Sequence, residues 1–528
     1  MKTMTDTTSN ANKQIARAAG TVMFAYILSN LTGLIRQVMV SNTFGTSQQL
    51  DAFYAAVTVP DLLFNLLAGG ALASAFIPIF TDLLNQRSSK EAYHLSSSIV
   101  SLIVLILGLG SLATVWLAPQ IVVKVLFAFR PELSADLLQL CISLLRIIMI
   151  APTIFGVSGI VMGILNTHQK FLIPAMAPVV NWIGWILGIV ILVPRIGIYG
   201  LAWGYVLGAA LHLGIQIPSL LALPKFEIRL DGNLLDAEVM RVLKLVGPRL
   251  FGVGAVQVNF LVNTMLAAGL SEGSLSAINV GKMVMTMPLF VIAQAIATAA
   301  LPTFSAMVAK GQKDEMGFSL VATLRGVLLL SLPASVGLIL LRVPATAILF
   351  QRGNFDAHST DLVAWAILWY TAGLVGHALV EILSRAFYAL HDTKTPVTIG
   401  IVAMGLNVAL SFAFVWVFSQ IGWMPHGGVA LANSFATAIE ALILLVAIRK
   451  PLGNLNIMEL GAGMVQAIVA GTVMALAMWG WLQASGSTGA LIQTVVGIVI
   501  GSTVYGLAVF ALKVPELNRL IAFARNKL

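Results

Sequence analysis

Apolar segments long enough to cross a lipid bilayer follow one another along almost the whole chain. A spanning helix needs roughly 20 mostly apolar residues, and a bilayer accepts only helices and closed barrels, because it cannot hydrogen-bond free backbone groups. The alternating pattern of barrel strands is absent, so the sequence predicts an all-α polytopic membrane protein with about 14 helices. These are expected at 18–41, 51–81, 92–118, 134–163, 171–194, 197–224, 239–270, 274–309, 318–342, 361–390, 396–420, 427–448, 461–484 and 488–512.

The composition agrees with this fold class. Hydrophobic residues make up 59% of the 528 residues and charged residues only 10%, whereas soluble globular proteins carry about 25% charged residues. The single cysteine, Cys141, excludes an intramolecular disulfide and a cysteine metal cluster. The polar start "MKTMTDTTSNANKQIARAAG" is followed by an apolar run without a short h-region and cleavage site, so we interpret residues 1–17 as a retained cytoplasmic tail.

Basic residues set the orientation, because cytoplasmic loops retain Lys and Arg. An even number of spans places both termini on one side of the membrane. With that side taken as the cytoplasm, six of the thirty basic residues lie within spans and nineteen lie in inner loops and tails. The net charge of +9 then comes mostly from the cytoplasmic Lys and Arg residues that set the membrane topology and face anionic lipid, so it requires no nucleic-acid partner. The outer loops hold only Lys124, Arg130, Arg195, Arg342 and Arg352.

Three local features recur at a nearly constant offset, as expected of an internal repeat. An offset of six spans predicts a parallel repeat, as in transporters whose two lobes rock about a central site. The matched pairs are Pro78 and Pro302, Leu165 and Leu390, and Gly200 and Gly428, at offsets of 224, 225 and 228 residues.

The repeat predicts two pseudo-symmetric six-helix lobes around a central cavity, with two further helices at the carboxyl end. The charged segment "KFEIRLDGNLLDAE" is the natural connection between the lobes. The expected divisions are the tail at 1–17, an N-lobe at 18–224, a cytoplasmic linker at 225–238, a C-lobe at 239–450, and a final pair of helices with a cytoplasmic end at 451–528.

Five motifs in a fixed order carry a family resemblance. They are "GLIRQ" at 33–37, "FGTSQQLDAFYAAVTVPDLLFNLLAGGALASAFIPIF", "LPTFS" at 301–305, "LFQRGNF" at 349–355 and "LSRAFYALHDTKTPV" at 383–397. In this order the chain resembles the MurJ (MviN) family, whose members are lipid II flippases of the multidrug/oligosaccharidyl-lipid/polysaccharide exporter superfamily. The resemblance implies a bacterial cytoplasmic (inner) membrane protein with a role in peptidoglycan synthesis. The implied substrate is undecaprenyl-pyrophosphate carrying a disaccharide-pentapeptide.

The family's functional residues carry over only in part. The cavity arginine of its "GLxR" stretch matches Arg36, and its aspartate before "AF" matches Asp51. Other members place charges where this chain has neutral residues, so the resemblance leaves the binding geometry open. These positions are Asn30, Gln37, Phe64, Gly69 and Met283, the last of which follows Lys282.

Basic residues deep within spans are the main candidates for the binding site. Arg36, Arg146, Arg249 and Lys282 come from the first, fourth, seventh and eighth spans. A charge at the bilayer centre costs roughly 2.5 to 3.5 kcal/mol, so such residues face a cavity or a partner. Guanidinium and ammonium groups suit a diphosphate, and we hypothesise that the four converge on one cavity. The alternative is interhelical pairing that fixes packing only. Arg325 and Arg385 lie near cytoplasmic ends, where they are expected to snorkel.

The second span carries two carboxylates and several helix-weakening residues. Asp51 is expected in a helix amino terminus, as a cap or in a gating role. Asp61 follows Pro60, which invites a break that could aim the carboxylate at Arg36. The pair Gly69 and Gly70 would allow flexing or close helix packing.

Secondary polar candidates that could share the cavity are Asn65, Gln257, Asn259, Asn263 and Asn279, each of which is otherwise explained as a helix-packing contact. We expect no enzyme activity, because no phosphate loop, zinc motif or group of acids suggests one. We expect no cofactor or metal, while a coupling ion or the membrane potential stays open. The expected partners are the lipid-linked oligosaccharide and membrane lipids, for a monomer that associates at most with cell-wall synthesis proteins.

Three other functions remain open at this stage. One is a flippase for another polyprenyl-linked glycan, such as an O-antigen or capsule unit. Another is a cation-coupled drug exporter of the same superfamily, for which acidic cavity residues would be expected. A non-transporting membrane scaffold is the third, and it requires no role for the deep basic residues.

Overall fold

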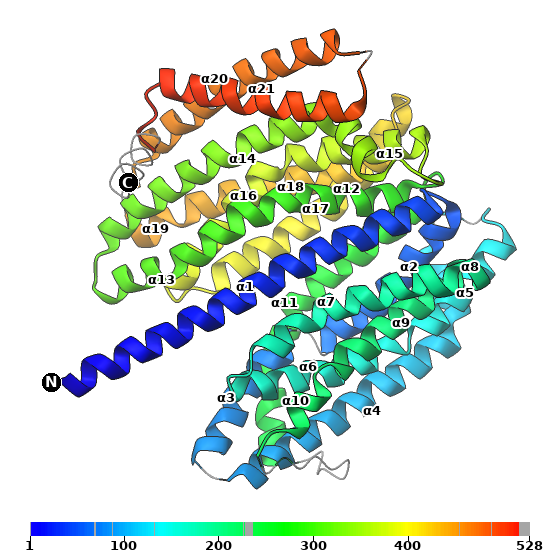
Figure 1. Cartoon of the computed structure of the whole chain (residues 1–528), viewed down its shortest axis with the longest axis vertical. Helices are drawn as coiled ribbons and strands as arrows, with labels where there is room; N and C mark the ends of the chain where they lie inside the picture. The colour runs from blue at the N-terminus through cyan, green and yellow to red at the C-terminus, as the bar shows by residue number, and fades with distance from the viewer. Residues whose placement is uncertain are drawn as a thin grey trace. The chain divides into compact units, whose positions relative to one another are not determined.

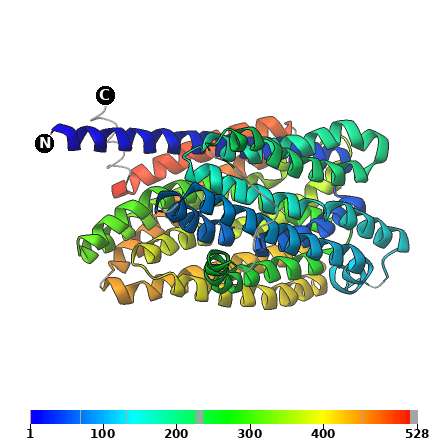
Figure 2. The same ribbon diagram turned by 90° about the horizontal axis from the view of Figure 1, so that it is seen from below.

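A computed structural model describes the backbone of residues 2–516 apart from 68–69, 87, 131, 225, 227–235, 454 and 487. The side chains of 2–19, 21, 67, 70–74, 248–249 and 251 also lie outside the described residues. Within the described part every regular element is a helix, as predicted (Figure 1). The chain forms two compact units, Met1–Gly269 and Leu270–Leu528. In each unit the long helices run roughly side by side (Figure 2).

The helices of the first unit are α1 (Lys2–Phe44), α2 (Gln48–Leu67), α3 (Gly70–Gln86), α4 (Ser89–Ile121), α5 (Ala135–Ile148), α6 (Ala151–Thr167), α7 (Leu172–Leu187), α8 (Val193–Ile196), α9 (Ile198–Gly214), α10 (Ile217–Leu221) and α11 (Ala237–Ala268). π-Helical turns continue α4 at Val122–Leu126 and α7 at Gly188–Leu192. Those of the second unit are α12 (Ser274–Leu289), α13 (Ala295–Ala309), α14 (Lys313–Phe350), α15 (Ala357–Ala372), α16 (Leu374–Ala389), α17 (Lys394–Gln420), α18 (His426–Ala447), α19 (Arg449–Leu452), α20 (Ile457–Ala484) and α21 (Ala490–Ala511), with a π-helical turn at Phe290–Gln294.

By length and composition, eleven stretches of the described residues can cross a membrane, or up to thirteen if each of two bent pairs counts as one span. The predicted count of 14 is therefore not confirmed. The bent pairs are Ala237–Gly247 with Gly252–Ala268 and Ala357–Ala372 with Leu374–Ala389. The eleven are Val22–Phe44, Ser89–Leu126, Ala135–Thr167, Leu172–Ile196, Ile198–Leu221, Ser274–Ala309, Lys313–Phe350, Lys394–Gln420, His426–Leu452, Ile457–Ala484 and Ala490–Ala511.

The predicted second span, 51–81, is the one that this count does not contain. Its described residues lie in α2, which carries Asp51 and Asp61, and in α3, which has 17 residues, while residues 68–69 between them lie outside the described residues. A single span over 51–81 therefore stays a prediction. The predicted break at Pro60 is wrong, because α2 continues past this residue to Leu67. A missing hydrogen bond at one proline is tolerated in membrane helices where neighbouring helices pack around it. Gly70 begins α3, and Gly69 lies outside the described residues.

The division into units differs from the predicted lobes. α11, expected to open the C-lobe, packs on α2 and α3 in the first unit. Thr58 of α2 also donates a hydrogen bond to Thr264 of α11 across 3.3 Å. The predicted linker at 225–238 therefore precedes the last helix of the first unit and does not separate the units.

The two matched turns of the predicted repeat share one conformation. Gln169 after α6 and His391 after α16 both have positive φ, 57° and 61°. In each turn the next residue donates a backbone hydrogen bond to the fifth residue before it, Lys170 to Leu165 and Asp392 to Phe387. This is the left-handed helix ending that satisfies the last carbonyl groups.

Glycines bring α7 and α9 into backbone contact. A Cβ atom added at Gly184 would overlap the backbone of Gly208, and one added at Gly188 would overlap Gly204. Glycines spaced four residues apart on both helices are a known route to tight helix pairing in membranes. We call this contact the glycine seam, and it fixes the separation of the side chains that α7 and α9 present.

Substitution in the glycine seam is expected to destabilise the protein strongly. Gly184→Val should lower the thermal midpoint in detergent by several degrees, because overpacking costs typically 1 to 3 kcal/mol and backbone cannot yield as a side chain can. Gly110→Val in α4 is the matched control, since a Cβ there meets nothing within 4 Å. Equal melting of the two variants would show that the contact contributes nothing.

Asp392 fixes the start of α17, within the family-like motif "LSRAFYALHDTKTPV". Its carboxylate accepts hydrogen bonds from the Thr395 hydroxyl at 2.6 Å and from the backbone N–H groups of Thr395 and Lys394 at 3.0 and 3.1 Å. These bonds, the Thr395 side chain first, lower the pKa of Asp392 below its ordinary value of 3.8. The motif thus encodes a helix cap.

The cap predicts a pH-dependent contribution to stability. Since the folded pKa is lowered, the stabilisation is present above about pH 4 and is lost as the pH falls through the folded pKa. Asp392→Ala should therefore cost about 1 kcal/mol at neutral pH, the usual worth of such a cap, and the difference from the parent should shrink as the pH falls below about 4. Thermal melts of the two proteins between pH 3 and 7 test this, and a difference that does not depend on pH would contradict it.

Candidate functional site

Arg36 in α1 lies over the faces of two tryptophan rings of α7. Its guanidinium carbon is 4.6 Å from the ring centroid of Trp182 and 4.6 Å from that of Trp185. Both distances are within the range of a cation–π interaction, and the two centroids are only 5.9 Å apart, so the rings lie on adjacent sides of the guanidinium group. Among the described residues the buried Nε atom has no hydrogen-bond partner, and no carboxylate forms an ion pair with this arginine. Aromatic contacts therefore provide the main stabilisation of Arg36.

The sequence of α1 explains why the indole of Trp182 fits there. Ser29, Gly33 and Arg36 lie on one face at helical spacing. The Trp182 Nε1–H donates to the Ser29 hydroxyl at 3.2 Å, and a Cβ at Gly33 would be 3.4 Å from the same nitrogen. The serine anchors the ring, the glycine leaves room for it, and the arginine stacks on it.

Aromatic contacts continue from Trp185 to Asp61. Trp185 is 5% exposed and contacts Phe53 at 5.6 Å and Tyr205 at 5.1 Å between ring centroids. The Tyr205 hydroxyl donates to the Asp61 carboxylate at 2.7 Å. The hypothesis that Asp61 contacts Arg36 is therefore wrong for this structure. Asp61 is anchored to α9, and Trp185 and Tyr205 lie between it and the arginine.

Asp51 lies in the first turn of α2, as predicted for a carboxylate at a helix amino terminus, and is 8% exposed. In the same turn the Ser47 hydroxyl accepts a hydrogen bond from the backbone N–H of Leu50 at 3.4 Å. The capping role and the gating role of Asp51 both stay predictions.

Neutral contacts occupy several positions where family members carry charges. Gln37 is 3% exposed and donates to the Tyr54 hydroxyl at 3.0 Å, which joins α1 to α2. Phe64 packs on Phe155 with ring centroids 5.6 Å apart. Asn30 is exposed and donates to a carbonyl of its own helix at 2.9 Å. These positions now contribute packing and hydrogen bonds within the first unit.

The structure describes the surroundings of the other three basic candidates to different extents. Arg146 is exposed, and its Nε donates to the Val115 carbonyl of α4 at 3.3 Å. The side chain of Arg249 lies outside the described residues. Lys282 is partly buried in α12, within electrostatic range of His377, whose ring lies 2.9 Å from the Asn433 side-chain oxygen. Because Lys282 belongs to the second unit, its convergence with Arg36 stays a prediction.

The secondary polar candidates have mostly local surroundings. Asn263 donates to Asn259 at 3.2 Å along α11, and the exposed Asn279 donates to a carbonyl one turn earlier at 2.9 Å. Asn65 and Gln257 are partly buried. Their part in substrate binding also stays a prediction.

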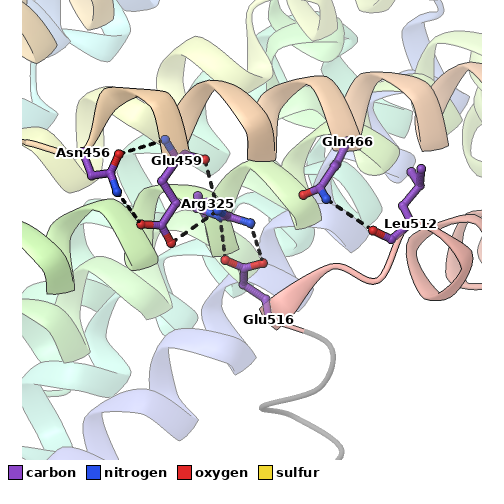
Figure 3. A network of polar contacts seen from close by, with 6 residues as sticks. All are labelled: Arg325, Asn456, Glu459, Gln466, Leu512 and Glu516. Carbon is purple, nitrogen blue, oxygen red and sulfur yellow. Dashed lines mark hydrogen bonds and ion pairs between the residues drawn. The ribbon is translucent and has the colours of Figure 1, made fainter.

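Arg325 was interpreted from the sequence as a snorkelling residue, and this was wrong. It is 3% exposed and forms ion pairs with Glu516 at 2.7 Å and with Glu459 at 3.4 Å (Figure 3). Its Nη1 also donates to the Glu459 carbonyl at 3.0 Å. This network joins α14 to α20 and to the segment after α21. The pair of Arg385 with Glu381, 2.8 Å apart, lies within one helix as predicted.

Among the described residues no group of three or more His, Cys, Asp or Glu side chains could hold a metal ion. An apolar groove on the first unit contains none of the candidates, and it is lined by Leu192, Ile196, Trp203, Val206, Leu207 and Ala210. The candidate chemistry is therefore that of a cation stabilised by aromatic rings, whose N–H groups can bind an anion.

Fold and site together define a multi-pass helical membrane protein with a positive charge held inside its first unit. The family described as "Lipid II flippase MurJ" matches residues 40–500. The chain belongs to this family. A lipid II flippase MurJ of Burkholderia cenocepacia is 32% identical over 441 residues, which cover 82% of this chain and 84% of the relative.

Solved structures agree on the fold. A lipid II flippase MurJ in an inward closed conformation superposes with a TM-score of 0.79 at 24% identity and covers 95% of this chain and 99% of its own. An inward-facing multidrug resistance MATE family transporter of the MOP superfamily superposes with a TM-score of 0.66 at 15% identity, over 80% of this chain and 94% of its own. These matches confirm the helical fold expected from the five motifs.

Proposed function

We propose that this protein is a lipid II flippase of the bacterial cytoplasmic membrane. It moves the undecaprenyl-pyrophosphate-linked peptidoglycan precursor from the inner to the outer leaflet by alternating access of two helical lobes. The observation that carries the proposal is Arg36, in the family's "GLxR" position, with its guanidinium group over two tryptophan rings and no carboxylate partner among the described residues.

Arg36 receives the pyrophosphate. Guanidinium forms charge-assisted, bidentate hydrogen bonds with phosphate oxygens, and a cation without an ion-pair partner need not break an existing bond first. Lys282 and Arg249 supply further positive charge from other helices, and Arg146 does so if its exposed side chain turns toward the substrate. The polyprenyl tail stays in lipid along α20 and α21.

The membrane potential, negative inside, favours outward movement of an anionic headgroup by about 2.3 kcal/mol per charge per 100 mV. No bond is made or broken in this process, so the protein is a transporter and not an enzyme, and it needs no cofactor. Both termini face the cytoplasm, and the protein works as a monomer alongside cell-wall synthesis proteins.

Rescue of a bacterium depleted of its own lipid II flippase tests the proposal. The protein should restore growth and the exposure of lipid II on the outer face of the membrane. Arg195→Gln, which removes an exposed charge from the same unit, serves as the control that should also rescue. Failure to rescue despite good expression would favour the alternative substrate, another polyprenyl-linked glycan.

Drug export is the weaker alternative, because the deep charge of the first unit is an arginine and Asp61 is engaged by a tyrosine hydroxyl. A scaffold without transport predicts that neutralising Arg36 leaves growth and lipid II exposure intact.

A further inference from the structure

We infer that Trp182 and Trp185 are positioning residues, which hold Arg36 by cation–π contacts in place of an ion pair, so that its N–H groups stay available to an anionic diphosphate headgroup. The inference rests on the proposed function for its substrate. It extends that function to two residues in α7 that the family-like motifs do not include. It also gives Asp61 a role, because Asp61 holds Tyr205 by a hydrogen bond and Tyr205 packs against Trp185.

Contact with aromatic rings stabilises the cation without occupying its N–H donors, as an ion pair would. Arg36 lies in a membrane helix, where a cation needs stabilisation. A carboxylate partner would supply it by occupying the N–H donors, and the diphosphate would then have to displace that partner. Aromatic faces attract the cation through the ring quadrupole, so that no carboxylate has to occupy the N–H donors. The distances of 4.6 Å to two rings, together with an Nε atom that has no hydrogen-bond partner among the described residues, fit this arrangement.

Both rings are themselves fixed by specific contacts. Trp182 is tied to α1 by its hydrogen bond to Ser29 and fits over Gly33. Trp185 is packed against Phe53 and Tyr205, and the Tyr205 hydroxyl is bonded to Asp61. The two tryptophans also contact one another edge to face, 5.9 Å between ring centroids. Trp182 thus has a polar anchor in Ser29, whereas Trp185 is held by ring contacts, and its Nε1 atom is buried without a hydrogen-bond partner among the described residues.

Direct binding measurements test the inference without depending on transport. Purified protein in detergent is titrated with undecaprenyl pyrophosphate, and affinity is compared among Trp182→Leu, Trp185→Leu, Trp182→Phe and Trp185→Phe. The leucine variants should bind about tenfold more weakly, because they fill space without a π-face. The phenylalanine variants should stay within about threefold of the parent. Trp116→Leu is the matched control, since Trp116 is 76% exposed on α4, and it should leave affinity unchanged.

Arg36→Lys supplies a second test that does not alter α7. Lysine keeps the charge but lacks a planar group to stack, so its affinity should fall as far as that of the leucine variants. In transport assays the same variants should raise the KM for lipid II more than they lower kcat. Melting curves show whether each variant is folded. If a leucine variant does not fold, the affinities of Arg36→Lys and of the two phenylalanine variants test the inference.

Equal affinities for the leucine and phenylalanine variants, or normal binding by Arg36→Lys, would overturn the inference and leave the tryptophans as packing residues. If the wild-type protein binds undecaprenyl pyrophosphate through Arg36 but does not transport lipid II, that result would contradict the proposed function and not the inference. The two failures are therefore distinguishable.

Discussion

Arg36→Gln is expected to reduce lipid II transport roughly 100-fold and to abolish rescue of a flippase-depleted bacterium. Hydrogen bonds to charged groups contribute about 1.5 to 3 kcal/mol each, and a bidentate contact with the pyrophosphate would lose two of them. Glutamine keeps some length and polarity, so the change removes charge and planarity with little loss of volume. The measurement is lipid II exposure on the outer face at matched expression.

Arg195→Gln controls for loss of one positive charge from the same unit, and it should transport normally. If Arg36→Gln also transported normally, the stacked arginine would be a packing feature and the substrate would be bound elsewhere. A stable but inactive Arg36→Gln protein, by contrast, assigns the loss to substrate contact and not to folding.

Removal of Arg325 is expected to destabilise the second unit by about 3 to 5 kcal/mol. Breaking a buried ion pair leaves its partners uncompensated, and here Glu516 would lose the cation 2.7 Å away, with its side chain only 15% exposed. Arg325→Gln should therefore lower the thermal midpoint in detergent and expose the segment after α21 to protease. Glu516→Gln should have a smaller effect, because Glu459 still contacts the arginine.

Arg385→Gln is the matched control for this prediction. Its ion pair with Glu381 lies within one helix, and the two side chains are 30% and 26% exposed. Such pairs are worth only about 0.3 to 0.5 kcal/mol. The double variant Arg325→Gln/Glu516→Gln should lose less than the sum of the two single variants. An additive loss would show that the two residues act independently.

Hydropathy was sufficient to predict the helical membrane fold, because the bilayer leaves few other choices. It did not show that α2 continues past Pro60, since apolar length alone does not show where a helix ends. Nor did loop charge locate the boundary between the units. The segment 225–238 is polar and basic, but the packing of α11 on α2 and α3 decides to which unit that helix belongs.

Partners far apart in sequence were the main obstacle at the site. Arg385 was matched with Glu381 because the two are one turn apart, whereas Glu459 and Glu516 are 134 and 191 residues from Arg325. Trp182 and Trp185 were missed because aromatic residues in a membrane helix are unremarkable by themselves. Their spacing of three residues on one helix face was the available signal, together with Gly33 and Arg36 on α1.

The glycine seam has a consequence for Arg36 that no direct contact reveals. A Cβ atom at Gly208 would lie 3.0 Å from the Trp185 ring and 2.6 Å from the Asn181 carbonyl. The Trp185 indole, which contacts Arg36, thus packs at the close contact between α7 and α9. Anything that separates these two helices, including a lipid chain or a single added methyl group, would therefore shift Trp185 and weaken its contact with Arg36.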